Sequence, residues 1–244
     1  MTLQLTNERK KIKAGYDSKY EYLREGEEMS HTIAHEAVIA YLRLVLVQLF
    51  AGQKVGVVTD VELTVAGDAE IEAENKAIYI SPDISVIDGL TVSETNALGL
   101  YRIGPGKPPP RVVFEIGSQE TRKADLETKP TTFAKMGIKE YFTFDPTGVW
   151  TGKWRKKAPL LGWSLGAAGQ SHEKDFATAG RLWSYELDSW LAVQPDHTLR
   201  LFDVKNQLRL TGEEVKEQQL AAERLHVQRL QARLRELGQN PDEM

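Results

Sequence analysis

The segment RVVFEIG, residues 111–117, constrains this chain most, because it places a carboxylate inside an apolar strand. Two valines and a phenylalanine run together, as in a strand at the centre of a sheet, and Glu115 follows them directly. An ionised carboxylate in apolar surroundings is costly unless a partner compensates its charge. A second acid, Asp125, and a lysine, Lys129, follow after a polar turn. The sequence therefore predicts a partner for Glu115 near the mouth of this strand.

The composition is that of a globular protein with a slight excess of acidic residues. The 244 residues suffice for one large domain, or for one domain with an appendage, and 41% of them are hydrophobic. A net charge of −4 argues against a protein that grips nucleic acid with its whole surface, so any such contact must be local or helped by metal ions. The absence of cysteine excludes disulfides and thiolate metal sites.

The pattern of hydrophobic residues points to a cytoplasmic protein. The first residues contain no apolar stretch of signal-peptide length. The longest apolar run, residues 37–50, contains Arg43 and is too short to span a bilayer.

Three regions are expected along the chain. Residues 1–29 are polar, include a basic cluster and form an N-terminal arm, whereas residues 30–210 form an α/β domain. Residues 211–244 form a helical extension that starts with a capping box, Thr211 with Glu214. This extension carries apolar residues at heptad spacing, which predict a short coiled coil and a homodimer: Leu220, Val227, Leu230, Leu234 and Leu237.

The domain itself should alternate helices and strands. A helix is expected from Ser30 or Thr32 to about Phe50, and Leu44 and Val47 widen its apolar stripe enough to predict that it is largely buried. Residues 121–137 predict a second helix that contains Pro130 and ends at Gly137, whereas the Gly- and Pro-rich residues 98–110 read as a loop. Strands are expected at residues 54–65, 77–88, 111–117 and 140–146, followed by short hairpin strands up to residue 210.

Three residues on these elements suit metal-dependent chemistry. Asp83 follows a proline in a strand-like run, Glu115 ends the next strong strand, and Lys129 lies on the helix beyond it. If the two strands are neighbours, both carboxylates can point at one spot and bind Mg²⁺ or Mn²⁺, which prefer hard oxygen ligands. A lysine beside the metal would orient or deprotonate water, or stabilise developing negative charge, in phosphodiester hydrolysis. Taken singly, each residue has an ordinary structural reading, as a turn aspartate, a strand-end glutamate or a surface lysine.

The same motifs resemble a known family. SPDISVI, and then VVFEIGSQETRKADLETKPTTFAKMGIKEYFTFDP, are similar to the Uma-type family described as "putative restriction endonuclease", within the PD-(D/E)XK nuclease superfamily. HTIAHEAVIAYL resembles the family's first helix, and RLRELGQNPDEM resembles its tail. The matched positions are Asp83, Glu115, Ser118, Thr121, Asp125, Lys129, Gly137, Glu140, Tyr141, Asp145 and Pro146.

This resemblance implies a restriction-endonuclease-like αβββαβ core with a mixed sheet, followed here by extra C-terminal hairpins and the C-terminal helix. It also implies a metal held by Asp83 and Glu115. The superfamily's lysine normally lies two residues after the glutamate, where this chain has Gly117, and Lys129 on the next helix would replace it. The chain departs from the family pattern at Gln119, where a proline is usual, and at Pro130.

Further residues have both a functional and a structural reading. His35 could hold a carboxylate or a phosphate, or simply pack; Ser118 could bind phosphate or cap a helix; and Asp125 could support Lys129 or form a surface pair at helical i, i+4 spacing. Lys153, Arg155 and Lys156 surround a tryptophan and could contact a nucleic-acid backbone, although a solvated hairpin is the commoner meaning of such a run.

We therefore predict a Mg²⁺- or Mn²⁺-dependent endonuclease that hydrolyses DNA and acts as a homodimer. One alternative is a catalytically inactive relative that keeps the fold as a nucleic-acid-binding or oligomeric interaction module. Another is an interaction protein whose activity lies in the C-terminal helix.

Overall fold

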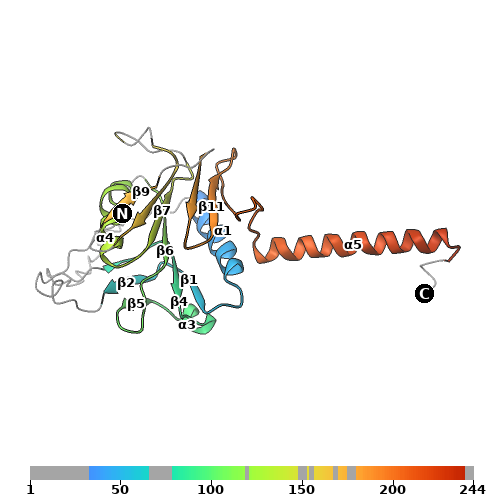
Figure 1. Cartoon of the computed structure of the whole chain (residues 1–244), viewed down its shortest axis with the longest axis horizontal. Coiled ribbons are helices and arrows are strands. Elements are labelled where there is room, and N and C mark those ends of the chain that lie inside the picture. The colour runs from blue at the N-terminus through green and yellow to red at the C-terminus, as the bar shows by residue number, and fades with distance from the viewer. Residues whose placement is uncertain are drawn as a thin grey trace, which may run out of the picture.

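The computed structural model describes residues 33–65, 79–118, 121–147, 153, 157–166, 170–174 and 180–239. The predicted arm 1–29 lies outside these residues, as do Gln119, Arg155 and Lys156. Figure 1 shows a body built on a twisted sheet, from which one long helix projects. Within the described residues, no helix has both the length and the apolar character needed to cross a membrane.

Six strands form the central sheet of the described part of the chain, in the order β1-β4-β6-β7-β8-β9. Their bounds are Val55–Thr59 for β1, Ile84–Asp88 for β4, Val112–Ile116 for β6, Glu140–Phe144 for β7, Leu160–Leu165 for β8 and Ser171–Glu173 for β9. Only β6 and β7 of this sheet are parallel; the other neighbours are antiparallel. Parallel neighbours need a crossover, and a helical segment between β6 and β7 supplies it.

Helices cover both faces of this sheet. Helix α1 (Ile33–Leu49) packs on one face, where Phe114 of β6 joins Leu42 and Leu46 in one apolar cluster. Helix α4 (Lys129–Lys135) lies on the other face, where Val113 of β6 joins Phe133 in a second cluster. Successive strand residues point to opposite faces, so Glu115 shares the α4 face with Val113. The element order α1-β1-β4-β6-α4-β7 is the predicted αβββαβ core with a mixed sheet.

Two smaller sheets flank this core in the described residues. One has the order β3-β2-β5 and the other β10-β11-β12. Their bounds are Glu62–Val65 for β2, Tyr79–Ile80 for β3, Leu100–Ile103 for β5, Arg181–Ser184 for β10, Ser189–Val193 for β11 and Leu199–Phe202 for β12. A short helix, α3 (Val92–Asn96), starts at a capping box formed by Thr91 and Glu94.

The strands predicted after residue 148 divide between two sheets. Strands β8 and β9 extend the main sheet, whereas β10, β11 and β12 form a sheet of their own.

Two predicted strands are each divided in the structure. Residues 54–65 form β1 and β2 in different sheets, because Asp60 takes a left-handed conformation (φ 53°) that turns the chain between them. Residues 77–88 likewise divide into β3 and β4 on either side of Pro82. The prediction that residues 98–110 form only a loop is wrong, since β5 lies within them and pairs in parallel with β2.

The prediction that α1 is largely buried is also wrong. Leu42 and Leu46 are fully buried against the sheet, but Leu44 and Val47 are each 47% exposed. The helix therefore buries one stripe, and its opposite side faces away from the sheet.

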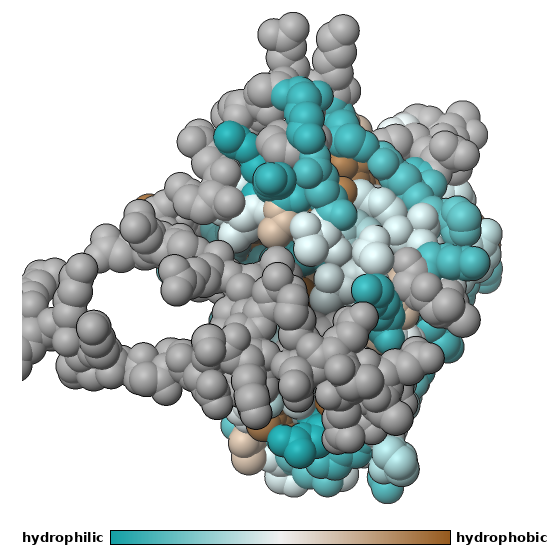
Figure 2. All heavy atoms as spheres, turned by 90° about the vertical axis from the view of Figure 1, so that its left-hand side faces the viewer, coloured by the Kyte–Doolittle hydropathy of each residue, from teal (hydrophilic) through white to brown (hydrophobic). Residues whose placement is uncertain are grey.

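The C-terminal helix α5 (Gly212–Glu236) has the predicted start. The Thr211 hydroxyl accepts from the Glu214 N–H, and the Glu214 carboxylate accepts from the Thr211 N–H. The helix extends far beyond the body (Figure 1), and none of its residues is buried. On the opposite side of the molecule, the described side chains are mostly hydrophilic or intermediate, with small hydrophobic areas (Figure 2).

Candidate functional site

The first two predicted metal ligands lie at neighbouring strand ends. Strands β4 and β6 pair antiparallel with Ile84 opposite Phe114, so Asp83 and Glu115 occupy the next position along the ladder. Oδ2 of Asp83 accepts a hydrogen bond of 2.5 Å from the Ile116 N–H. This bond ties the aspartate to the end of β6. The sheet therefore brings together two carboxylates that are 32 residues apart in the sequence.

Lys129 meets Glu115 from the helix that covers this face. Its ammonium nitrogen lies 2.7 Å from Oε1 of Glu115 and 2.9 Å from Oδ1 of Asp125. The side chains of Lys129 and Glu115 are only 3% and 5% exposed. The contacts are close ion pairs rather than well-aligned hydrogen bonds. Lys129 is thus the partner that the buried position of Glu115 requires.

Pro130 directly follows Lys129 and accounts for the wide helical turn that precedes it. Residues Ala124–Thr128 form a π-helical turn, and the Lys129 N–H donates to the carbonyl of Ala124, five residues back. Proline has no N–H, and its ring clashes with the carbonyl four residues back in a regular α-helix, so a wider turn before it relieves both conflicts. Regular helix begins at Lys129, and the chain leaves the helix through Gly137 with φ at 79°.

Burial and the neighbouring charges change the pKa values of Glu115, Asp125 and Lys129. Burial raises the pKa of the Glu115 carboxyl well above its usual value, and the charges of Asp83 and Asp125 add to this, while Lys129 opposes it. Burial also raises the pKa of the Asp125 carboxyl. Burial alone would lower the pKa of Lys129, but the charges of Glu115 and Asp125 outweigh it and raise that pKa. Lys129 therefore keeps its proton, and its one positive charge is shared between the carboxylates of Glu115 and Asp125.

His35 reaches the site from α1 on the other side of the sheet end. Its Nε2 lies 3.1 Å from the Ile116 carbonyl oxygen, which can only accept, so Nε2 carries a proton. The same nitrogen is 3.6 Å from Oδ2 of Asp83. Burial would lower the pKa of His35, but the hydrogen bond to Asp83 and the charge of Asp83 raise it. His35 thus contacts one of the two predicted metal ligands.

A short hydroxyl chain orients Asp125. The Ser118 hydroxyl oxygen accepts a 3.1 Å hydrogen bond from the Thr121 N–H, so Ser118 acts at the start of the helical segment as a cap would. The Thr121 hydroxyl donates to Oδ2 of Asp125 at 2.7 Å, and the Tyr141 hydroxyl donates to the Asp125 backbone carbonyl at 3.0 Å. Asp125 is therefore held on both sides, which fixes the carboxylate that faces Lys129.

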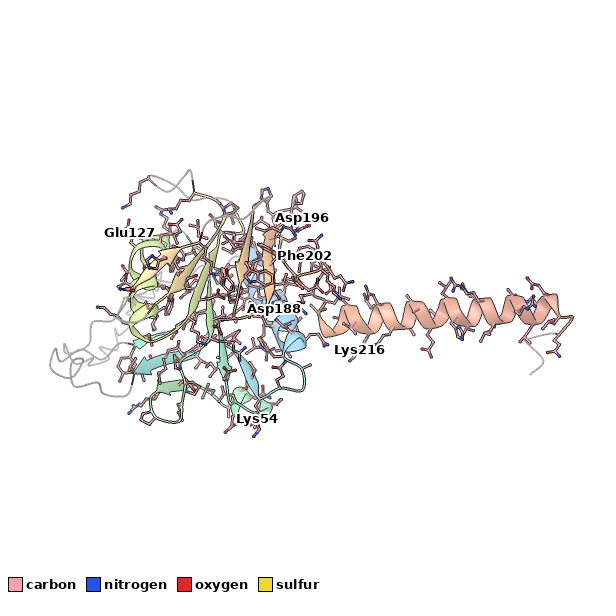
Figure 3. All side chains as sticks on the ribbon, in the orientation of Figure 1. Lys54, Glu127, Asp188, Asp196, Phe202 and Lys216 are labelled. Atoms are coloured by element: carbon pink, nitrogen blue, oxygen red, sulfur yellow. The ribbon has the colours of Figure 1, made fainter. Side chains whose placement is uncertain are left out.

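The predicted nucleic-acid contacts are only partly described. Lys153 forms an ion pair with Glu127, which lies at the α4 end of the body (Figure 3), far from Lys216 at the base of α5. Arg155 and Lys156 lie outside the described residues. Their role in binding nucleic acid stays a prediction.

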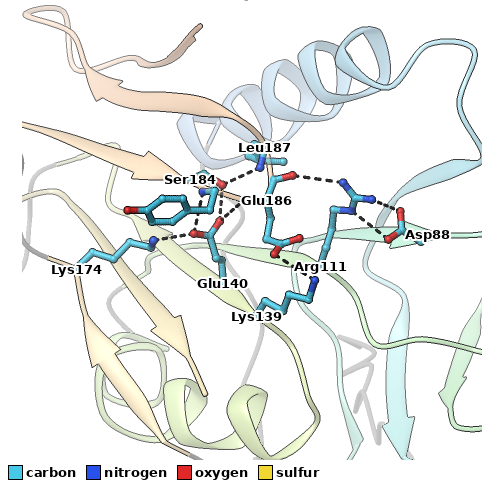
Figure 4. Close-up of polar contacts among 9 residues, drawn as sticks. Asp88, Arg111, Lys139, Glu140, Lys174, Ser184, Glu186 and Leu187 are labelled. Carbon is cyan, nitrogen blue, oxygen red and sulfur yellow. Dashed lines mark hydrogen bonds and ion pairs between the residues drawn. The ribbon is translucent and has the colours of Figure 1, made fainter. Parts of the chain in front are cut away.

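A second buried glutamate, Glu140, was matched to the family pattern in the sequence but was given no role there. Glu140 opens β7 and accepts from Lys174 (2.7 Å), from Ser184 (2.5 Å), and from the backbone N–H groups of Tyr185 and Glu186 (Figure 4). A glutamate next to an apolar strand run is the same signal that marks Glu115. The two glutamates differ in their partners. Glu140 accepts hydrogen bonds from these four donors, whereas Glu115 lies close to the acids Asp83 and Asp125 as well as to Lys129. Glu140 thereby joins the central sheet to the β10–β12 sheet.

The residues present fit a magnesium or manganese ion. Mg²⁺ is commonly held by one or two carboxylates, with water and substrate phosphate completing its shell. Asp83 and Glu115 supply two such carboxylates, and the contacts described above engage one oxygen of each. In the described part of the chain, no group of three or more His, Cys, Asp or Glu residues is arranged to hold a metal. Any ion at this pair would therefore depend on water and substrate for its remaining ligands.

The αβββαβ core, with acids and a lysine gathered where β4 and β6 meet, is a restriction-endonuclease-like fold. The family model of Uma2, described as "putative restriction endonuclease", matches residues 7–194. The chain therefore belongs to the Uma2 family. Among solved structures, it is similar to a putative nuclease belonging to DUF820 from Anabaena variabilis ATCC 29413, with 14% sequence identity, coverage of 64% of this chain and 75% of the other, and a TM-score of 0.41. No curated protein matches the chain.

Proposed function

We propose that this protein is a cytoplasmic endonuclease that hydrolyses DNA phosphodiester bonds with the help of Mg²⁺ or Mn²⁺. The observation that supports this most is the convergence of Glu115 and Lys129, from a strand and a helix, beside Asp83 on the neighbouring strand. Membership of the Uma2 family supports the same class of activity.

Each side chain would have a distinct role in this reaction. Asp83 and Glu115 would hold the ion, and such an ion polarises a phosphate oxygen and lowers the pKa of a bound water. Because the pKa of Lys129 is raised, its ammonium group would act as a fixed positive charge rather than as a base. Asp125 would position Lys129, and His35 would position Asp83. The site would therefore stabilise the negative charge that develops on the phosphate.

DNA would be contacted locally. A net charge of −4 does not favour binding over the whole surface, so we assign the backbone contacts to the basic run that includes Lys153, Arg155 and Lys156. The ion pair of Lys153 with Glu127 would open when a phosphate takes the place of the carboxylate.

A second candidate function is a catalytically inactive interaction module with the same fold. The observation that favours it is the burial of Lys129 and Glu115, because a closed ion pair is also a structural feature. Metal binding separates the two candidates without relying on activity. Isothermal titration calorimetry with MgCl₂ should give saturable binding to the wild type that is lost in Glu115→Gln and in Asp83→Asn. The matched control Glu127→Gln, at an exposed carboxylate outside the pair, should bind as the wild type does. Absence of binding by the folded wild type, with Mg²⁺ and with Mn²⁺, would favour the inactive module.

A further inference from the structure

Helix α5 is attached to the body by its first turn alone. Thr211 is buried there, and Glu214 forms an ion pair of 3.4 Å with Arg200 of β12. The Arg200 guanidinium lies 4.5 Å from the centre of the Tyr41 ring of α1, which joins this turn to the first helix. Beyond it, from Lys216 onward, the helix runs away from the body (Figure 3). Most helical stability in proteins comes from the packing of an amphipathic face, and none of the residues of α5 is buried in this chain.

One side of this helix is apolar and exposed. We call it the α5 seam: Leu220, Val227, Leu230, Leu234 and Leu237, which repeat at heptad spacing. Leu230 is 52% exposed, and Leu220, Val227 and Leu237 are exposed as well. Apolar residues at this spacing form the contact stripe of two-helix coiled coils. The α5 seam is therefore a surface without a partner in the described part of this chain.

The charges of α5 are separated along its length. Its first turns carry Glu213, Glu214 and Glu217, with Lys216 among them. Its later turns carry four arginines: Arg224, Arg229, Arg233 and Arg235. A parallel pair would place acid beside acid and arginine beside arginine, which is unfavourable. In an antiparallel pair that seats Leu220 on Leu237 of the other copy, the acidic first turns of each helix lie beyond the end of the partner helix, so acid no longer lies beside acid.

Glu223 distinguishes the two orientations most clearly. It lies three residues after Leu220 and three before His226, at a heptad position that faces the partner together with Leu230 and Leu237. In a parallel pair, Glu223 would face the Glu223 of the other copy across the seam, so that two like charges would be partly desolvated together. In an antiparallel pair it would face Leu234 and lie near the arginines of that end.

We propose that α5 forms an antiparallel two-helix coiled coil with α5 of a second copy of this chain. In this arrangement Leu220 packs on Leu237 of the second copy, and Val227 packs on its Leu230. The two bodies then lie at opposite ends of the helix pair, where they do not compete for space. This inference does not depend on the proposed nuclease function, since it rests on α5 alone.

The oligomeric state of the full chain tests the proposal. Light scattering after size-exclusion chromatography should give a dimer for the wild type and a monomer for Leu230→Asp. The matched control is Leu225→Asp, because Leu225 is 48% exposed but lies outside the seam, and this variant should stay dimeric. Circular dichroism should show a folded body in both variants. A monomeric wild type, or a Leu230→Asp variant that stays dimeric, would overturn the proposal.

The orientation has its own test, which the absence of cysteine simplifies. A spin label on Lys216→Cys should report a distance of about 40 Å between the copies in the antiparallel pair, from a rise of 1.5 Å per residue. A parallel pair would bring the labels to within about 20 Å, because packed helix axes lie about 10 Å apart. The shorter distance would overturn the antiparallel arrangement.

Discussion

The ammonium group of Lys129 lies 2.7 Å from Oε1 of Glu115, and both side chains are almost completely buried. This pair joins the helix that follows β6 to the strand itself. It satisfies the charge of a glutamate in an apolar strand, and it places a permanent positive charge beside the Asp83–Glu115 pair. The same contact is therefore expected to matter both for stability and for chemistry.

Removing the charge of Lys129 should destabilise the fold. The variant Lys129→Met keeps most of the side-chain volume but leaves Glu115 and Asp125 buried without a cation. Breaking a buried ion pair from one side costs about 3–5 kcal/mol, and this loss should appear in urea unfolding at neutral pH. The control Lys139→Met, at an exposed lysine of the same region, should change the free energy of unfolding by less than about 0.5 kcal/mol.

The carboxyl partner should rescue that loss. Adding Glu115→Gln to Lys129→Met removes the buried negative charge that lacks a partner, so the double variant should be more stable than Lys129→Met alone. The coupling energy from such a cycle should exceed about 1 kcal/mol, as is usual for residues in one charged network. Additive effects of the two substitutions would contradict a direct interaction.

The His35–Asp83 contact should stabilise the protein below neutral pH. The pKa of His35 is raised in the folded protein from its ordinary value of 6.5, chiefly because the hydrogen bond to Asp83 and the charge of Asp83 outweigh burial. A raised pKa means that the folded state binds the proton more tightly. The stabilisation is therefore fully present below pH 6.5 and is lost as the pH rises through the folded-state pKa.

The variant His35→Gln isolates this charge, since glutamine retains a donor for the Ile116 carbonyl but has no titrating ring. Urea unfolding of the wild type and the variant between pH 5.5 and 9 should show a stability difference that shrinks as the pH rises. A difference that grows with pH would show that burial, rather than Asp83, governs His35.

The second buried glutamate should matter for stability and not for metal binding. Glu140→Leu would leave Lys174, Ser184 and two backbone N–H groups without their acceptor, so the body should lose about 3–5 kcal/mol of stability. Mg²⁺ binding by the protein that remains folded should be unchanged. Weaker Mg²⁺ binding in that folded fraction would show that Glu140 and the Asp83–Glu115 pair are linked.

Sequence reasoning located the main elements because their patterns are local. Three such local features are the apolar run of β6, the capping box at Thr211 and Gly137, the glycine that follows helix α4. The meeting of Asp83, Glu115 and Lys129 was also predictable, because strands that carry acids at the same end of a sheet bring them together. The family resemblance predicted that Lys129 takes the place of the superfamily's lysine, which would stand where this chain has Gly117.

The errors concern features that depend on distant parts of the chain. Strand β5 is flanked by glycine and proline, and it forms because β2, about 40 residues earlier, offers an edge to pair with. The exposure of Leu44 and Val47 follows from the absence of a second layer over that side of α1 among the described residues, which periodicity does not reveal. Glu140 bonds to Lys174 and Ser184, which lie 34 and 44 residues further along the chain, so no local pattern joins them.

The most direct test of the central claim is nicking of supercoiled plasmid DNA by the purified full chain with Mg²⁺, with Mn²⁺ and with EDTA. We expect nicking by the wild type with either metal, none with EDTA, and at least a hundredfold loss in Glu115→Gln, on the order of the loss when one electrostatic contributor to a transition state is removed. Lys139→Met should nick as the wild type does. Nicking that persists with EDTA, or that Glu115→Gln retains in full, would contradict a metal-dependent site at Asp83, Glu115 and Lys129.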